Sequence, residues 1–290
     1  MDLSAAVEGV IEVTNKPSRV EDFIKAIEEL RERGWLSQAN AASLRGRVTY
    51  AEGQLFSRVA AVMLPDLRRR AMPGALGMRV TAFLLDELTW MRDFMIASIP
   101  RRIRASDGRR PVVVMTDAYL SDNCDRAGIG AVLLNGRGEA IRFISEEVPA
   151  GVLKIIQAET KHVITALEVL PVYFVRVAWN TEMVHRRCFI FVDNDGARHS
   201  LLRCTSGSQS VLRVLRKVVL LQAEWPCFTW YSRVPSPANI ADDPSRGNVT
   251  DLMESGVSRH KWTAALGAKH CRKWGRARQR RSGRAVPLFI

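Results

Sequence analysis

Four acidic residues stand where secondary-structure elements are expected to begin or end. Asp117 and Asp193 each close an apolar, β-branched run, Glu159 lies in the first turn of an expected helix, and Asp242 lies in a polar loop. If the two strands are neighbours, their terminal aspartates and a glutamate on a helix packed across them converge on one point. Carboxylates so close together repel one another unless their pKa values rise or a cation neutralises them. The pattern therefore predicts an acidic metal site.

The expected donor atoms are all carboxylate oxygens, which favours Mg²⁺, with Mn²⁺ as the alternative, over zinc. Two such ions about 4 Å apart activate a water molecule and stabilise the leaving oxygen in phosphodiester cleavage. The expected cofactor is accordingly a pair of Mg²⁺ ions. Asp243 follows Asp242 directly, so it is the substitute for the fourth ligand.

The elements that must position these acids follow from the periodicity of the apolar residues. Strands are expected at residues 111–117, 127–135, 139–148, 187–192 and 228–234, and helices at 158–169 and 208–223. This order predicts an α/β fold, a mixed five-stranded sheet that begins with an antiparallel meander and carries flanking helices. In such a sheet the first and fourth strands are the neighbours that end in Asp117 and Asp193.

The chain is expected to divide into three parts. Residues 1–105 are predicted to be mostly helical, residues 106–250 to form the α/β domain, and residues 251–290 to form a basic, flexible tail. With 43 Lys and Arg against 30 Asp and Glu, the net charge is +13, and ten of the basic residues follow residue 255 with no acid among them. The tail is either a solvated end or a nucleic-acid contact. The residues expected to contact nucleic acid are Arg246, Arg272, Lys273, Arg276, Arg278, Arg280 and Arg281.

Several classes of protein are disfavoured by composition. The five cysteines include no Cys-x-x-Cys pair, which argues against a disulfide framework and a zinc knuckle. No apolar run reaches the roughly 18 residues of a membrane span, and the first residues lack a secretory signal pattern. We therefore expect an intracellular protein, cytoplasmic or nuclear, with no membrane partner.

Four segments around these acids resemble the RNase H domain of retroelement reverse transcriptases. They are VVVMTDAYLSDNCDRAGIGAVLL, the QAE at Glu159, FVDNDGARHSLL and VPSPANIADDPSRG. The last segment resembles the Asn-x-x-Ala-Asp-x-x-Ser-Arg type of ending and is the most specific single motif. Upstream, VTNKPSRVEDFIKAIEELRERGWLSQANAASLRGRVTYAEGQLFSRVAA is similar to the helical thumb or connection region that precedes RNase H in such elements. The resemblance implies an RNase H-like fold, with Asp117, Glu159, Asp193 and Asp242 as catalytic metal ligands. The 34 positions from Glu159 to Asp193 then imply an extra strand or loop in residues 171–187.

The resemblance also implies an activity. The implied activity is that of a metal-dependent endonuclease that cuts the RNA strand of RNA–DNA hybrids and forms the C-terminal part of a reverse transcriptase. The expected partners are an RNA–DNA hybrid or other nucleic acid and the polymerase part of such an enzyme. The alternative is a catalytically inactive, RNase H-like nucleic-acid-binding protein derived from a retroelement. A transposase or integrase is disfavoured because those enzymes place their glutamate last, whereas Glu159 comes second.

Overall fold

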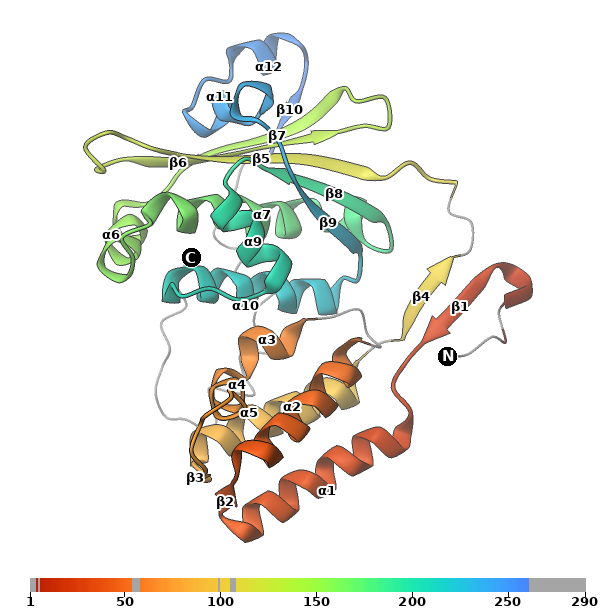
Figure 1. The fold of residues 1–290 in the computed structure, drawn as a ribbon. Coiled ribbons are helices and arrows are strands. Elements are labelled where there is room, and N and C mark those ends of the chain that lie inside the picture. The colour runs from red at the N-terminus through yellow and green to blue at the C-terminus, as the bar shows by residue number, and fades with distance from the viewer. Residues whose placement is uncertain (1–3, 5, 54–57, 99, 105–107, 261–290) are drawn as a thin grey trace. The chain divides into compact units, whose positions relative to one another are not determined.

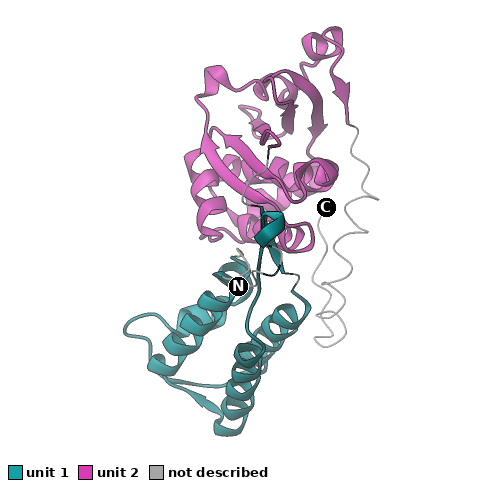
Figure 2. Ribbon diagram, turned by 90° about the vertical axis from the view of Figure 1, so that its right-hand side faces the viewer, with its two compact units in different colours: residues 1–107 teal, residues 108–290 magenta. Residues whose placement is uncertain are grey.

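The computed structural model describes residues 4, 6–53, 58–98, 100–104 and 108–260 (Figure 1). The chain forms two compact units, residues 1–107 and residues 108–290, which Figure 2 colours separately.

The first unit is mostly helical, as the sequence predicts. Its helices are α1 (Pro17–Arg33), α2 (Gln38–Gly53), α3 (Val59–Met63), α4 (Pro65–Arg70) and α5 (Ala82–Ala97), preceded by a short 3₁₀ turn at Ala6–Glu8. Its strands are β1 (Val10–Val13), β2 (Trp35–Leu36), β3 (Met78–Arg79) and β4 (Arg101–Arg104), of which β1 pairs with β4 and β2 with β3, both antiparallel.

Helix α1 shows why this unit folds as the pattern predicts. The helix begins at Pro17, whose fixed φ and missing N–H suit the first helical position. It ends before Gly34, which takes the left-handed conformation with φ of 64° and donates its N–H to the Leu30 carbonyl. Phe23, Ile27 and Leu30 share one buried face, and this face packs toward α5.

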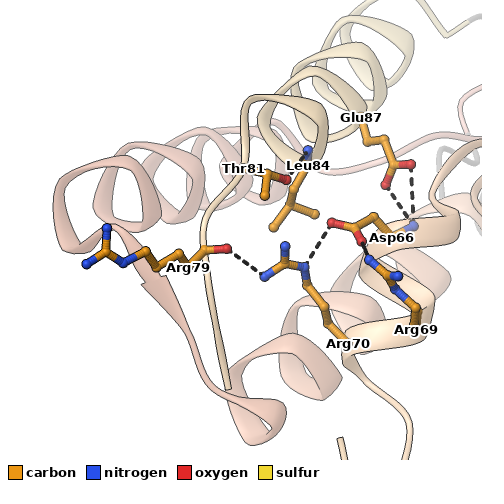
Figure 3. A network of polar contacts seen from close by, with 7 residues as sticks. All are labelled: Asp66, Arg69, Arg70, Arg79, Thr81, Leu84 and Glu87. Carbon is orange, nitrogen blue, oxygen red and sulfur yellow. Dashed lines mark hydrogen bonds and ion pairs between the residues drawn. The ribbon is translucent and has the colours of Figure 1, made fainter. Parts of the chain in front are cut away.

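A buried polar network joins α4 to β3 and α5 (Figure 3). The Asp66 N–H, at the start of α4, donates to the Glu87 carboxylate at 3.2 Å, and Arg70 Nε donates to Asp66 Oδ2 at 2.8 Å. The same guanidinium donates from Nη1 to the Arg79 carbonyl at 2.9 Å. Asp66, Arg70 and Glu87 are all buried, so each contact satisfies a group that has lost water.

The second unit alternates strands and helices. Its strands are β5 (Val112–Leu120), β6 (Ala127–Leu134), β7 (Ala140–Glu147), β8 (Arg187–Val192), β9 (Phe228–Arg233) and β10 (Ser258–Arg259). Its helices are α6 (Ala150–Glu159), α7 (Val163–Ala178), α8 (Asn180–Met183), α9 (Asp195–Arg203), α10 (Gln209–Glu224), α11 (Asp242–Ser245) and α12 (Thr250–Glu254), with a 3₁₀ turn at Ser236–Ala238.

These strands form one mixed sheet in the order β10-β7-β6-β5-β8-β9. Strands β5, β6 and β7 are the antiparallel meander, and β8 and β9 extend the sheet in parallel with β5. The predicted mixed α/β sheet with flanking helices is confirmed. It has six strands where five were expected, because the two-residue strand β10 adds to the edge beside β7.

Helices cover both faces of the sheet. Figure 1 shows α6, α7, α9 and α10 on one side and α11 and α12 on the other. Helix α7 packs directly on β5 and β6, and α10 packs on α7. On the opposite face, Val132 and Phe143 of the sheet form a small core with Ala241 and Val257. The loop and short helices at residues 239–254 are thereby fixed against the sheet beside β5.

Two stretches differ from the expected elements. The single helix expected at 158–169 is two helices, because the chain is extended at Thr160 between α6 and α7. Residues 171–187, expected to hold an extra strand or loop, continue α7 through Pro171 to Ala178 and then form α8. Of the residues assigned to the tail, 251–254 belong to α12 and 258–259 form β10, and residues 261–290 lie outside the described residues.

Candidate metal centre

Asp117 and Asp193 lie side by side on two central strands of the sheet. Strands β5 and β8 are parallel neighbours, and their register pairs Thr116 with Val192, so each aspartate directly follows the last paired residue of its strand. The prediction that Asp117 closes its strand is wrong, because β5 continues to Leu120 and pairs Asp117 with Gly130 of β6. This juxtaposition is the one that the sequence predicts.

The third carboxylate at this point belongs to Glu168, in the second turn of α7. Each of Asp117, Glu168 and Asp193 offers a carboxylate oxygen, and these oxygens all lie within 4.8 Å of one another. Asp117 and Glu168 are each 3% exposed, and Asp193 is half-buried. The cluster is therefore a buried acidic group that opens toward solvent through Asp193.

The electrostatics of this cluster favour protons or a cation. Burial, reinforced by the charges of Asp117 and Asp193 and by a hydrogen bond with Asp193, raises the pKa of Glu168 to about 10, against the lowering effect of a hydrogen bond from the Ala118 backbone. Burial also raises the pKa of Asp117 to about 6, against the lowering effect of a hydrogen bond from Ser245. A cation at this point would restore the charged forms of both carboxylates.

Two side chains from the loop after β9 hold Asp117. Asn239 Nδ2 donates to Asp117 Oδ1 at 3.2 Å and to the Thr116 carbonyl at 3.1 Å. The Ser245 hydroxyl donates to Asp117 Oδ2 at 2.7 Å. Both carboxylate oxygens are therefore fixed by residues more than 120 positions away in sequence. Asn239 and Ser245 belong to the segment NIADDPSR at residues 239–246, so this motif has a structural role as well as supplying an acid.

This loop can approach Asp117 because two glycines of β6 lie beneath it. A Cβ atom at Gly130 would lie 2.5 Å from Ser245 N and closer still to the Ala241 carbonyl oxygen. A Cβ atom at Gly128 would overlap the Ser245 carbonyl oxygen. Any larger residue at these positions would displace the loop, and the Gly-x-Gly of β6 is thus a packing requirement of the site.

Asp242 begins α11 and lies at the margin of the cluster. Its charge raises the pKa of Asp117, which places it electrostatically near that residue, but its oxygens are not among the three that come together. Both Asp242 oxygens instead accept from Arg246 Nε at 3.1 Å. Asp242 therefore stays the candidate for the fourth ligand, with Asp243 as its substitute.

The structure does not bring Glu159 to this site. Glu159 is the last residue of α6, and its carboxylate accepts hydrogen bonds from Ser210 and Arg213 of α10. Burial alone would raise its pKa, but these two partners hold it below the ordinary value. The expected position of the glutamate is therefore corrected from Glu159 to Glu168, because the helix that packs under the sheet is α7 and not an extension of α6.

A signal for Glu168 is present in the sequence. Helix α7 reads VITALEVLPVYFVRVA, and its only charged residues are Glu168 and Arg176. A helix that is apolar on every side is buried, and an acid within it is costly unless it has a function or a partner. Pro171 conceals this signal because proline is expected to end a helix, whereas α7 continues past it.

The residues present fit a hard divalent cation. All three converging groups are carboxylates, and Glu168 Oε2 is buried with no hydrogen-bond partner among the described residues. A buried acceptor without a donor is uncommon in folded proteins, and a bound ion would satisfy it. Oxygen-only ligands favour Mg²⁺ or Mn²⁺ among the biological metals.

The expected nucleic-acid contacts divide into two sets. Arg246 lies at the site, paired with Asp242, and its guanidinium carbon is 4.8 Å from the centre of the Tyr119 ring. The other predicted contacts lie outside the described residues, namely Arg272, Lys273, Arg276, Arg278, Arg280 and Arg281. None of the described helices is long and apolar enough to cross a membrane.

No protein-family model matches this sequence, and no curated protein does. Among solved structures, the chain is similar to RNase H1 from the halophilic archaeon Halobacterium salinarum, with a TM-score of 0.38, 16% identity, and 49% of this chain and 98% of that chain covered. The N-terminal RNase H domain of a Mycobacterium tuberculosis protein gives a TM-score of 0.38 at 14% identity, over 47% of this chain and 95% of that one. LC11-RNase H1, solved in complex with an RNA/DNA hybrid, gives a TM-score of 0.36 at 13% identity, over 49% of this chain and 99% of that one.

Proposed function

We propose that this protein is a metal-dependent ribonuclease H that cuts the RNA strand of RNA–DNA hybrids. The observation that carries the proposal is the buried cluster of Asp117, Glu168 and Asp193, whose oxygens lie within 4.8 Å of one another where the pairing of two parallel strands ends. The segment NIADDPSR at residues 239–246 supports it, because its Asn239 and Ser245 hold one of these carboxylates.

In the proposed mechanism, Asp117, Glu168 and Asp193 would hold the Mg²⁺, with Asp242 as the fourth ligand. Such ions, when bound, make a water molecule nucleophilic at neutral pH and stabilise the negative charge on the leaving oxygen. Asn239 and Ser245 keep both oxygens of Asp117 in place, so that carboxylate needs little reorganisation before the reaction. Glu168 is almost fully buried, which excludes bulk water from its side of the site.

The choice of strand would rest on the 2′-hydroxyl, the group that distinguishes RNA from DNA along a backbone. The net charge of +13 favours association with any polyanion and so does not by itself select the hybrid. We therefore expect hybrid, duplex DNA and duplex RNA all to bind, and only the RNA strand of the hybrid to be cut.

Cleavage of a hybrid with a labelled RNA strand tests this proposal. The full-length protein is incubated with Mg²⁺, Mn²⁺ or EDTA, and titration calorimetry with Mn²⁺ alone measures metal binding without turnover. We expect Glu168→Gln to lower the cleavage rate by about 100-fold or more and to weaken metal binding, because it removes an anionic ligand from the cluster. The matched control is Glu159→Gln, the same change at the glutamate of α6, which should leave both measurements close to wild type.

The opposite result would reassign the site. If Glu159→Gln abolished cutting while Glu168→Gln cut normally, the carboxylate assignment would be wrong although the nuclease would stand. If neither metal nor cutting were detected with the wild-type protein, the nuclease proposal itself would fall, and an inactive nucleic-acid-binding protein would be the better description.

We also propose that the chain acts in the context of a retroelement reverse transcriptase, with the polymerase part of such an enzyme as partner. The support is the sequence resemblance at residues 234–247 and in the helical first unit. Gel filtration of an equimolar mixture with a reverse transcriptase polymerase domain tests this, and separate elution of the two proteins would argue against it.

A further inference from the structure

A small pocket lined by arginines lies directly beside the carboxylate cluster. Its volume is about 200 Å³, and Ser245, which donates to Asp117, forms part of its wall. Three guanidinium groups line it from three separate elements: Arg126 precedes β6, Arg246 follows α11 and Arg259 lies in β10. We call this cavity the arginine pocket.

Arg246 is held in one plane at the wall of the arginine pocket. Its Nε donates to both oxygens of Asp242, and its guanidinium group stacks over Tyr119, which also lines the pocket. Nη1 and Nη2 make no hydrogen bond within the described part of the chain. A guanidinium fixed in this way presents two donors with little further loss of conformational entropy.

The other two arginines are also only partly engaged. Arg259 Nη2 donates to the Ser145 carbonyl at 2.6 Å, and Arg259 forms no ion pair with a described carboxylate. Arg126 Nε lies 3.6 Å from Glu147, in a pair whose side chains are 73% and 68% exposed. An exposed pair of this kind contributes little, so a stronger anion can compete with Glu147 for Arg126.

We propose that the arginine pocket binds one backbone phosphate of the nucleic-acid strand that lies in the adjacent carboxylate site. Arginine forks match the oxygens of a phosphate. The three arginines face Glu146 and Glu147 on the same wall, while Asp242 is engaged by Nε of Arg246 and leaves the two terminal nitrogens of that guanidinium for a phosphate. The pocket and the cluster share Ser245, so a phosphate held here lies on the same strand or its complement, close to the bond to be cut. This inference rests on the proposed function only for the identity of the polyanion.

Binding measurements in EDTA test the pocket without any need for cleavage. The affinity of the full-length protein for a short fluorescent RNA–DNA hybrid is measured from 0.1 to 1 M salt. Because each neutralised phosphate contributes about 0.7 to 0.9 to the slope of log K against log salt, Arg126→Ala with Arg259→Ala should lower the slope by that amount. Relative to the wild-type protein, the double alanine variant therefore loses about five- to eightfold more affinity at 0.1 M salt than at 1 M salt.

The matched control is Arg137→Ala, which removes a cation from the exposed turn between β6 and β7 without touching the pocket. We expect its slope to equal that of the wild-type protein. An equal loss in the control and the pocket variant would show a diffuse electrostatic effect and overturn the proposal, as would no loss in either. If the alanine variant melts early, Arg126→Lys with Arg259→Lys keeps the charges and tests the fork, with an intermediate loss expected.

A hybrid in which single phosphates are replaced by neutral methylphosphonates locates the contact. One replacement should cost the wild-type protein about five- to eightfold and cost the double alanine variant nothing further, since the partner is already absent. Equal costs in both proteins at every position would overturn the proposal. If the protein cuts the hybrid but the methylphosphonate costs both proteins the same affinity, the nuclease proposal holds and the pocket proposal fails. If the methylphosphonate costs only the wild-type protein affinity and no cutting is detected, the pocket proposal holds and the nuclease proposal fails.

Discussion

Replacing Gly130 by alanine should disable the candidate site without altering any carboxylate. Gly130 is paired with Asp117 across β5 and β6, directly beneath the loop that holds Asp117. The added Cβ would lie 2.5 Å from Ser245 N and 3.0 Å from Ser245 Cα, whereas ordinary contacts of this kind are 3.4–4 Å. The loop must therefore move outward by about 0.9 Å, as the van der Waals contact requires.

A shift of that size breaks the hydrogen bond to Asp117. The Ser245 hydroxyl and Asp117 Oδ2 are 2.7 Å apart, and a retreat of about 0.9 Å takes them beyond hydrogen-bonding distance. Losing a hydrogen bond to a charged group costs about 1.5–3 kcal/mol, and overpacking adds about 1–3 kcal/mol. Because a misplacement of about 1 Å can cost about 100-fold in rate, we expect Gly130→Ala to cut hybrid about 100-fold more slowly.

The assay is the rate of hybrid cleavage at saturating Mg²⁺, together with the melting temperature. The matched control is Gly151→Ala in α6, where an added Cβ meets nothing within 4 Å. This control should cut normally and gain about 1 kcal/mol in stability, because alanine favours helix over glycine. Wild-type cleavage by Gly130→Ala, with the melting temperature unchanged, would refute the idea that β6 and the loop are packed as tightly as described.

Two further substitutions test the site and the first unit. Ser245→Ala should lower the cleavage rate about tenfold and raise the Mg²⁺ concentration needed for half-maximal activity, because the Ser245 hydroxyl donates to Asp117. Ser245→Thr keeps a hydroxyl and should keep most of the activity. Equal cleavage rates for the alanine variant and the wild-type protein would contradict this. Burial raises the pKa of Glu52 to about 7, so the folded state binds a proton that the unfolded state releases, and stability is lost as pH rises from about 4.5 through 7. Glu52→Gln should therefore stabilise α2 at pH 8 by up to about 3 kcal/mol and have little effect at pH 4.5. Hydrogen exchange of the α2 amides measures this stability. Equal effects of the substitution at both pH values would contradict the prediction.

The elements that the sequence could predict are those with a strong local pattern. The run RCFIFV is apolar and β-branched, and it forms β8 as expected. Its neighbour in the sheet is predictable as well, because a meander followed by helix-linked strands leaves few topologies. Asp117 and Asp193 follow from these two facts. They require only that two strands be parallel neighbours and that an acid stand where the pairing between them ends, although β5 itself continues past Asp117 to Leu120.

Glu168 could not be reached in the same way because local signals conflict around it. The apolar pattern runs through residues 158–169 without a glycine or proline to mark the break at Thr160. Pro171 then suggests an end where α7 continues, since the helix is held by packing against β5 and β6 and tolerates one missing N–H. Tertiary contacts decide the register here, and they decide which glutamate faces the aspartates.

The loop at residues 239–246 shows a further kind of information that spacing does not contain. Its motif predicts an acid, yet the contacts that fix Asp117 come from the flanking Asn239 and Ser245, and Asp242 itself is held by Arg246. Those contacts depend on Gly128 and Gly130, which a sequence reading assigns to an ordinary strand. A motif of this kind is therefore constrained from two sides: by the carboxylate that it supplies and by the glycine surface on which it must lie. A change on either side should have the same consequence, because both act on the position of one carboxylate at the centre of the cluster.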